Sequence, residues 1–118
     1  MMADLAILSG ETPRPARQAG LQHRFRYWRG ASGKRYLFSV VPAEALADFR
    51  AVVVMQAEPM ADGRLICRSV CAVESNADMV ALPRGMVALV HFLAPTELER
   101  RRIVNDLSYS RPTLRLAA

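Results

Sequence analysis

The chain has 118 residues and a mass of 13.1 kDa, which fits one domain because a single core usually forms from about 100 to 150 residues. A hydrophobic share of 52% against 23% charged residues is too apolar for a wholly disordered protein. The longest uncharged stretch, residues 85–96, is well short of the about twenty residues that a membrane span needs, so we expect a soluble protein. Residues 1–10 carry no basic leader and hold Asp4 in a short apolar run, so no secretory signal is predicted and the expected compartment is cytoplasmic.

Positive charge is gathered into blocks along the chain. Sixteen basic and eleven acidic residues give a net charge of +5 and a pI near 10.0. Residues 12–43 contain six arginines, one lysine and no acid, whereas residues 44–99 contain eight acids and four arginines. Such segregation favours contact with nucleic-acid phosphates, anionic lipid or an acidic protein. The alternative is a composition bias, since fifteen of the sixteen basic residues are arginine.

The first ordered element is predicted to be a β-hairpin. Residues 1–20 mix proline and glycine with polar residues and read as a flexible N-terminal arm, as residues 108–118 read as a flexible tail, which leaves one domain at 21–107. Residues 22–29 alternate between apolar and charged side chains, and residues 35–41 are rich in aromatic and β-branched residues. The sequence Gly-Ala-Ser-Gly at 30–33 is a turn signal between them.

The pattern of aromatic residues predicts the register of this hairpin. A four-residue loop places Tyr27 opposite Tyr36 and Phe25 opposite Phe38, which gives one consistently apolar, inward face. A five-residue loop would set Arg26 opposite Phe38 and mix charge with the rings, so the four-residue loop is preferred. Trp28 and the arginines then face outward.

The rest of the chain predicts an α+β fold. We expect a short helix at 42–50, a second hairpin from strands at 51–57 and 64–73, and a strand at 86–93 covered on both faces, with a helix as the alternative there. Thr96 and Glu99 form a capping box, so a helix should run from Glu97 to Leu107 with Ile103 facing the sheet. The fold class is therefore a mostly antiparallel sheet of about five strands, built from two hairpins, with a C-terminal helix packed on one face.

One feature of the sequence resembles a binding site, namely the outward face of the first hairpin. Arginine can bind phosphate with a fork of donors, and an exposed indole can stack on a base. We therefore predict a small, non-enzymatic binding or regulatory module that contacts RNA or single-stranded DNA. The predicted nucleic-acid-binding residues are Arg24, Arg26, Trp28, Arg29, Lys34 and Arg35.

Other interpretations remain open. Trp28 can instead be covered by arginines or by the terminal helix, and the module can instead bind an acidic protein or form a homodimer through an edge strand such as 51–57. A metal-independent ribonuclease would use His23 and His91, the only histidines, as acid and base. The C-x3-C spacing of Cys67 and Cys71 fits neither a disulfide within a strand nor a recognised zinc motif, so no cofactor or metal is expected.

Overall fold

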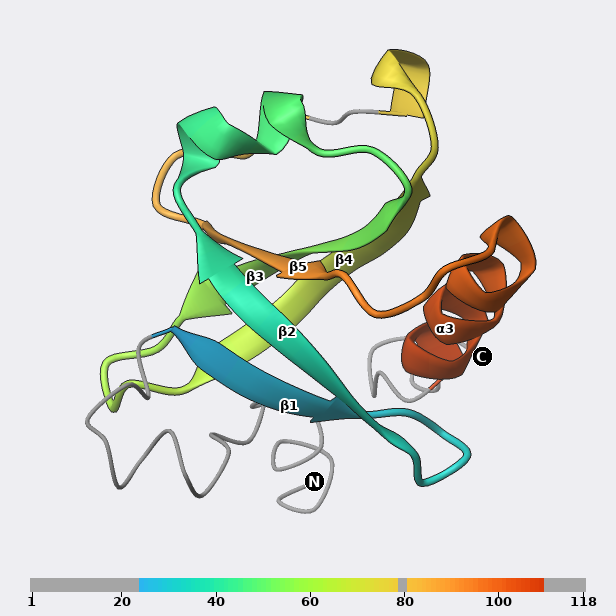
Figure 1. Ribbon diagram of the computed structural model, residues 1–118. Coiled ribbons are helices and arrows are strands. Elements are labelled where there is room, and N and C mark those ends of the chain that lie inside the picture. Colours follow the sequence, from blue (N-terminus) through green and yellow to red (C-terminus); the bar gives the residue numbers. More distant parts are fainter. Residues whose placement is uncertain (1–23, 79–80, 110–118) are drawn as a thin grey trace.

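A five-stranded antiparallel sheet carries one C-terminal α-helix in the computed structural model, which describes residues 24–78 and 81–109 (Figure 1). The α+β fold predicted from the sequence is confirmed. The strands are β1 (Phe25–Arg29), β2 (Arg35–Val41), β3 (Val52–Pro59), β4 (Leu65–Val73) and β5 (Val87–His91), and the helix is α3 (Glu97–Tyr109). Two short 3-10 helices, η1 (Ala43–Asp48) and η2 (Asn76–Asp78), lie in the connections.

The ends of the chain bear on the expected domain limits. The arm at 1–20 lies outside the described residues, and so do residues 110–118 of the expected tail. The helix α3 ends at Tyr109, two residues beyond the expected Leu107. The short helix expected at 42–50 is the 3-10 helix η1, which buries Leu46. No helix among the described residues is both long and apolar enough to cross a membrane.

The strand order is β1-β2-β5-β3-β4, so the last strand of the chain is inserted between the two hairpins. The run at 86–93 is therefore a strand and not a helix, and it pairs with β2 and β3. Leu89 is buried in the cluster on one face of the sheet, and Ala88 and Val90 are buried in the cluster on the other face. This insertion corrects the expectation of an exposed edge at 51–57. That segment forms β3, which pairs with β4 on one side and β5 on the other, so the sheet edges are β1 and β4.

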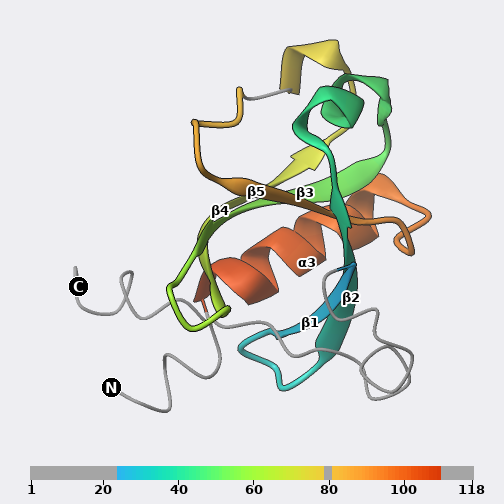
Figure 2. The same ribbon diagram turned by 90° about the vertical axis from the view of Figure 1, so that its left-hand side faces the viewer.

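Each face of the sheet has its own hydrophobic cluster. On one face α3 packs against β3 and β4, and Ile103 and Leu107 are buried there with Trp28 and Phe38 (Figures 1 and 2). We call this the helix face. The smaller cluster on the opposite face gathers Leu46 of η1 with valines of β3, β4 and β5. Alternation along the strands assigns successive side chains to these two faces.

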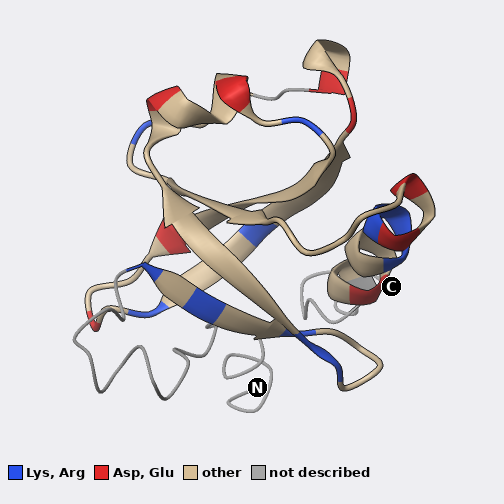
Figure 3. Cartoon of the chain, viewed as in Figure 1, with Lys and Arg blue, Asp and Glu red and all other residues tan. Residues whose placement is uncertain are grey.

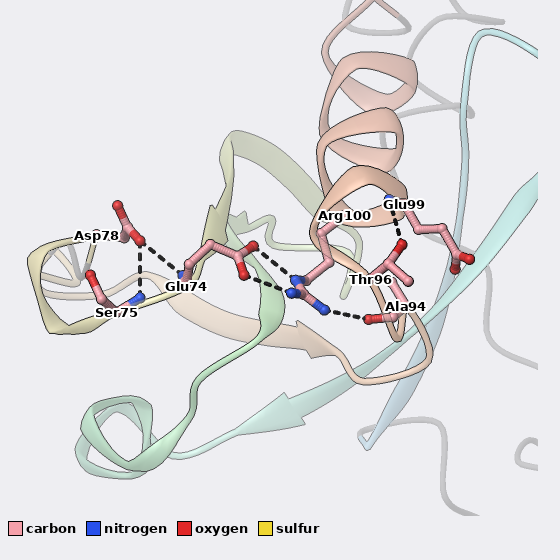
Figure 4. A network of polar contacts seen from close by, with 7 residues as sticks. All are labelled: Glu74, Ser75, Asp78, Ala94, Thr96, Glu99 and Arg100. Carbon is pink, nitrogen blue, oxygen red and sulfur yellow. Dashed lines mark hydrogen bonds and ion pairs between the residues drawn. The ribbon is translucent and has the colours of Figure 1, made fainter.

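The start of α3 is fixed by a cap and by a buried ion pair (Figure 4). The backbone N–H of Glu99 donates to Thr96 Oγ1 at 3.1 Å, which confirms the predicted cap. Arg100 is 6% exposed; its guanidinium donates to both carboxylate oxygens of Glu74, at 2.8 and 2.6 Å, and to the carbonyl of Ala94 at 2.8 Å. The helix is thereby tied to the end of β4.

Candidate nucleic-acid interface

The register of the first hairpin differs from the one that we predicted. Arg29 pairs with Arg35, Trp28 with Tyr36 and Arg26 with Phe38, across a five-residue loop. The prediction was wrong because it treated an arginine beside rings as a buried charge. The Arg26 side chain is half-buried and its guanidinium reaches the Gly63 carbonyl at 3.3 Å, so its aliphatic stem covers the core while its charge stays at the rim.

A contact with α3 fixes the loop length. Asp106 accepts hydrogen bonds from the Ser32 N–H at 2.8 Å, the Ser32 hydroxyl at 2.6 Å and the Tyr36 hydroxyl at 2.7 Å. Gly30 passes so close that an added Cβ would lie 2.1 Å from an Asp106 carboxylate oxygen. Only glycine fits there, and the loop between 29 and 35 is held against the helix.

This contact shifts the ionisation of both partners. Burial raises the pKa of Tyr36 to about 12, and the hydrogen bond to Asp106 and its negative charge add to the effect. Burial by itself raises the pKa of Asp106, but hydrogen bonds from Ser32 and Tyr36 outweigh it and lower the pKa below its ordinary value. Asp106 is therefore a charged structural anchor for the turn.

Trp28 does not face water. Its side chain is 2% exposed and belongs to the cluster under α3, so the predicted exposed indole is wrong. The indole nitrogen is buried and has no hydrogen-bond partner in the described part of the chain. Packing under the helix, which the sequence left open as an alternative, is the role that the structure shows for this residue.

The six predicted site residues are divided between two faces of the hairpin. Arg26 and Trp28 lie on the helix face, and burial lowers the pKa of Arg26. Arg29 and Arg35 lie directly opposite each other on the other face, and both are exposed. Arg24 is exposed at the start of β1, and Lys34 is exposed in the turn.

The face opposite the helix presents rings together with arginines. Phe25, Tyr27 and Leu37 lie on it beside Arg29 and Arg35, and neither hydrophobic cluster of the described residues includes those three apolar side chains. The Arg35 guanidinium carbon lies 4.8 Å from the centre of the Tyr27 ring, a cation-π contact. We call this surface, formed by Phe25, Tyr27, Arg29, Arg35, Leu37 and Ser39, the open face.

The open face continues toward the end of β5. Ser39 of β2 pairs with Val90 of β5, and continuing this antiparallel register by two residues places Phe92 beside Leu37. The 2.7 Å contact between His91 Nδ1 and the Leu37 carbonyl supports this placement. Phe92 is 46% exposed, and its ring meets that of Phe49 at 5.2 Å. One exposed ring, that of Phe92, therefore lies at the end of β5, and it packs on Phe49, which is half-buried against the smaller hydrophobic cluster.

A hollow of about 520 Å³ lies at the other end of the open face. Phe25, Val41 and Pro42 give it apolar walls, and Ser39 supplies a hydroxyl. Arg24 supplies the charge that the described residues contribute to its lining, and Val40 also lines it. A concave site with apolar walls and a few polar groups is the usual form of a small-ligand or base-binding pocket.

Basic residues are concentrated on this hairpin in space as well as in sequence (Figure 3). Residues 24–41 carry four arginines and one lysine and no acid, although Asp106 of α3 contacts the turn of the hairpin and Asp62 lies in the β3-β4 turn, which Arg26 reaches at Gly63. The three consecutive arginines of α3 diverge, because successive residues of an α-helix are about 100° apart. Arg100 is buried, Arg101 lines a groove beside β4, and Arg102 lines a depression with Lys34.

The groups considered for catalysis or metal binding offer little chemistry here. His91 is buried at 5% exposure against Tyr36 and Phe38, and His23 lies outside the described residues. Cys67 and Cys71 are both free thiols, and burial raises the pKa of Cys71. Within residues 24–78 and 81–109, no group of three or more metal-ligating side chains lies together.

Sequence reasoning missed the half-buried rings of the open face. Phe25 and Tyr27 were assigned to the core because an alternating strand of this composition has rings on both faces. The glycine at 33, with φ of 90°, and the Gly30 N–H bond to the Lys34 carbonyl are features of the five-residue loop that no spacing rule specified. Comparisons with family models, curated proteins and solved structures find no match to this chain.

Proposed function

We propose that this protein binds single-stranded nucleic acid through the open face of its first hairpin. The observation that supports the proposal most directly is the combination of half-buried Tyr27 and Phe25 with exposed Arg29 and Arg35 on one sheet surface, which α3 does not cover. Nucleic-acid platforms of this type combine stacking rings with cations that follow the backbone.

The arginine pair gives this surface an affinity for anions. Arg29 and Arg35 are directly opposite across the strands, so two exposed guanidinium groups lie on one part of this surface. The fork of donors on each side chain suits the oxygens of a phosphate. Lys34 and Arg102 add positive charge at the same end of the hairpin.

The ring of Tyr27 adds a stacking surface beside that phosphate site. The Arg35 guanidinium covers one side of the ring, so a base can extend the same column by stacking on the planar guanidinium. Lysine has no such plane, and an Arg35→Lys substitution therefore keeps the charge but removes the stacking. This difference separates base contact from simple attraction between charges.

The test is fluorescence anisotropy of the full chain with a labelled single-stranded oligonucleotide of about ten nucleotides, across a range of salt concentrations. Each phosphate contact on a single strand contributes about 0.7 to the slope of log affinity against log salt. The double variant Arg29→Gln, Arg35→Gln should lower that slope by about 1.4 and weaken binding roughly 25-fold at about 0.1 M salt.

A matched control distinguishes the open face from net charge. Arg101→Gln removes one positive charge from the groove beside β4, away from the first hairpin, and should change affinity far less than Arg35→Gln. Equal losses for the two single variants, or wild-type protein that does not bind the oligonucleotide, would overturn the proposal.

A second candidate function is protein binding, because Phe92 is 46% and Leu93 69% exposed at the border of the open face. In that case the partner would cover the rings, and self-association or binding of an acidic protein would replace nucleic-acid binding. An apolar contact changes little with salt, so a salt-insensitive dimer in sedimentation experiments would favour this candidate.

A further inference from the structure

The hollow at the start of β1 has features that the proposed function does not by itself explain. Its volume is about 520 Å³, and it combines the ring of Phe25 with the hydroxyl of Ser39 and the cation of Arg24. A flat apolar group fits beside the ring, a polar edge meets the hydroxyl, and an anion meets the arginine. Those three properties together describe a nucleotide.

We infer that this hollow is a nucleobase subsite that takes one unstacked base of the bound single strand, with Phe25 as its stacking surface. The inference rests on the proposed function and adds to it the place and the conformation of one base. DNA and RNA share this chemistry, so the base and not the sugar defines the site.

The spacing along β1 supports an unstacked base. Phe25 and Tyr27 are two residues apart on one face of the strand, which separates their side chains by about 7 Å. Stacked bases in one strand of a duplex follow each other at about 3.4 Å. Bases over these two rings therefore cannot remain stacked on each other, so the surface should accept an extended single strand and exclude a duplex.

The charges around the hollow agree with this arrangement. Among the described residues, Arg24 is the charged residue of the lining, and none of the described acids takes part in it. The backbone N–H of Val40 donates to the Arg24 carbonyl at 2.7 Å, which fixes the main chain at Arg24 beside the hollow. A base on Phe25 would thus have its phosphate near Arg24, and the next nucleotide would lie toward Tyr27 and Arg35.

The experiment compares two probes of about ten nucleotides on the full chain, an oligothymidine and an oligonucleotide of equal length with abasic sites throughout. Both carry the same phosphates, and only the first carries bases. Wild-type protein should prefer the oligothymidine, and Phe25→Leu should reduce that preference by about 5-fold to 150-fold, which is the value of one stacked base. Titrations of the wild type and of Phe25→Leu with oligouridine in place of oligothymidine should show the same loss of preference for bases.

Controls separate loss of the subsite from loss of folding. Phe49→Leu also removes a half-buried ring, but Phe49 does not line the hollow, so this variant should leave the preference for bases unchanged. Thermal melting of each variant checks that the fold is retained, and Ser39→Ala provides a second, smaller change within the hollow. It should alter the preference between oligothymidine and oligocytidine, which differ at the base edge.

The outcomes distinguish the subsite from the function. Equal binding of both probes by wild-type protein would overturn the subsite and leave phosphate binding by the open face intact. An unchanged preference in folded Phe25→Leu would also overturn the subsite. Absence of binding to either probe would overturn the proposed function together with the subsite, and would direct attention to a protein partner.

Discussion

Asp106 provides the sharpest test of how this structure sets the hairpin register. Its carboxylate accepts three hydrogen bonds, two from Ser32 and one from Tyr36, at 2.6 to 2.8 Å. A hydrogen bond to a charged group contributes about 1.5 to 3 kcal/mol where water is excluded. The Tyr36 bond is half-buried and takes most of this value, whereas the two bonds at Ser32 are exposed and contribute little because water replaces them.

We therefore expect Asp106→Ala to lower the free energy of unfolding by about 1.5 to 3 kcal/mol. Such a loss corresponds to a fall in melting temperature of roughly 6 to 24 °C for a domain of this size. The assay is urea unfolding followed by circular dichroism, with the slope m compared between variants so that a change in midpoint reports stability. Asp106→Asn keeps the shape and one acceptor oxygen, and should lie between Asp106→Ala and the wild type.

The effect of pH follows from the lowered pKa of Asp106. A carboxyl with a lower pKa in the folded state stabilises that state fully above its unfolded value, near pH 4, and loses the contribution as the pH falls through the folded value. The stability difference between wild type and Asp106→Asn should therefore be constant near neutral pH and shrink below about pH 4. A loss under about 0.5 kcal/mol in Asp106→Ala, or a difference that grows in acid, would refute this account of the turn.

Three further predictions concern the core under α3 and the contacts that fix the start of this helix. Trp28→Ala should lower the free energy of unfolding in urea by about 3 to 5 kcal/mol. Trp28→Phe should lower it less, since the indole N–H has no partner to lose within the described residues, and it should leave oligonucleotide affinity unchanged. Weakened binding by folded Trp28→Phe would contradict the buried role. Thr96→Ala removes the cap of α3 and should lower stability by about 1 kcal/mol, and an unaltered unfolding midpoint would exclude that cap as a stabilising contact. Glu74→Gln should lower the melting temperature at neutral pH. Because hydrogen bonds from Arg100 lower the pKa of Glu74, the difference in melting temperature between this variant and the wild type should narrow in acid. A difference in melting temperature that is independent of pH would show that the ion pair contributes nothing.

Local sequence signals located most of the elements. The strand limits of β2 were predicted without error, and β4 and the start of α3 were predicted to within a residue, because alternation, turn residues and a capping box are local features. The exposure of Leu98, 50%, also follows from its place off the stripe formed by Ile103 and Leu107. These signals require no knowledge of what lies across the sheet.

The candidate site was harder to predict than the fold. The sequence identified the correct hairpin and placed Arg24, Arg26 and Trp28 on one face of it, but it pointed that face toward water. Both faces of β1 carry rings and arginines, so alternation alone cannot say which face the helix covers. The position of the half-buried rings of Phe25 and Tyr27 on the face away from the helix was missed for that reason.

The sequence by itself determined the secondary structure, the antiparallel sheet with its terminal helix, and the concentration of positive charge between residues 24 and 41, since each depends on residues close together in the chain. Tertiary structure alone decided the hairpin register, the burial of Trp28 and the interior position of β3 between β5 and β4. Asp106 holds the turn from more than seventy residues away, and β5 enters between two hairpins formed long before it in the sequence. Such long-range contacts decide which face of β1 is buried, because the side chains that the packed helix covers are the ones removed from water.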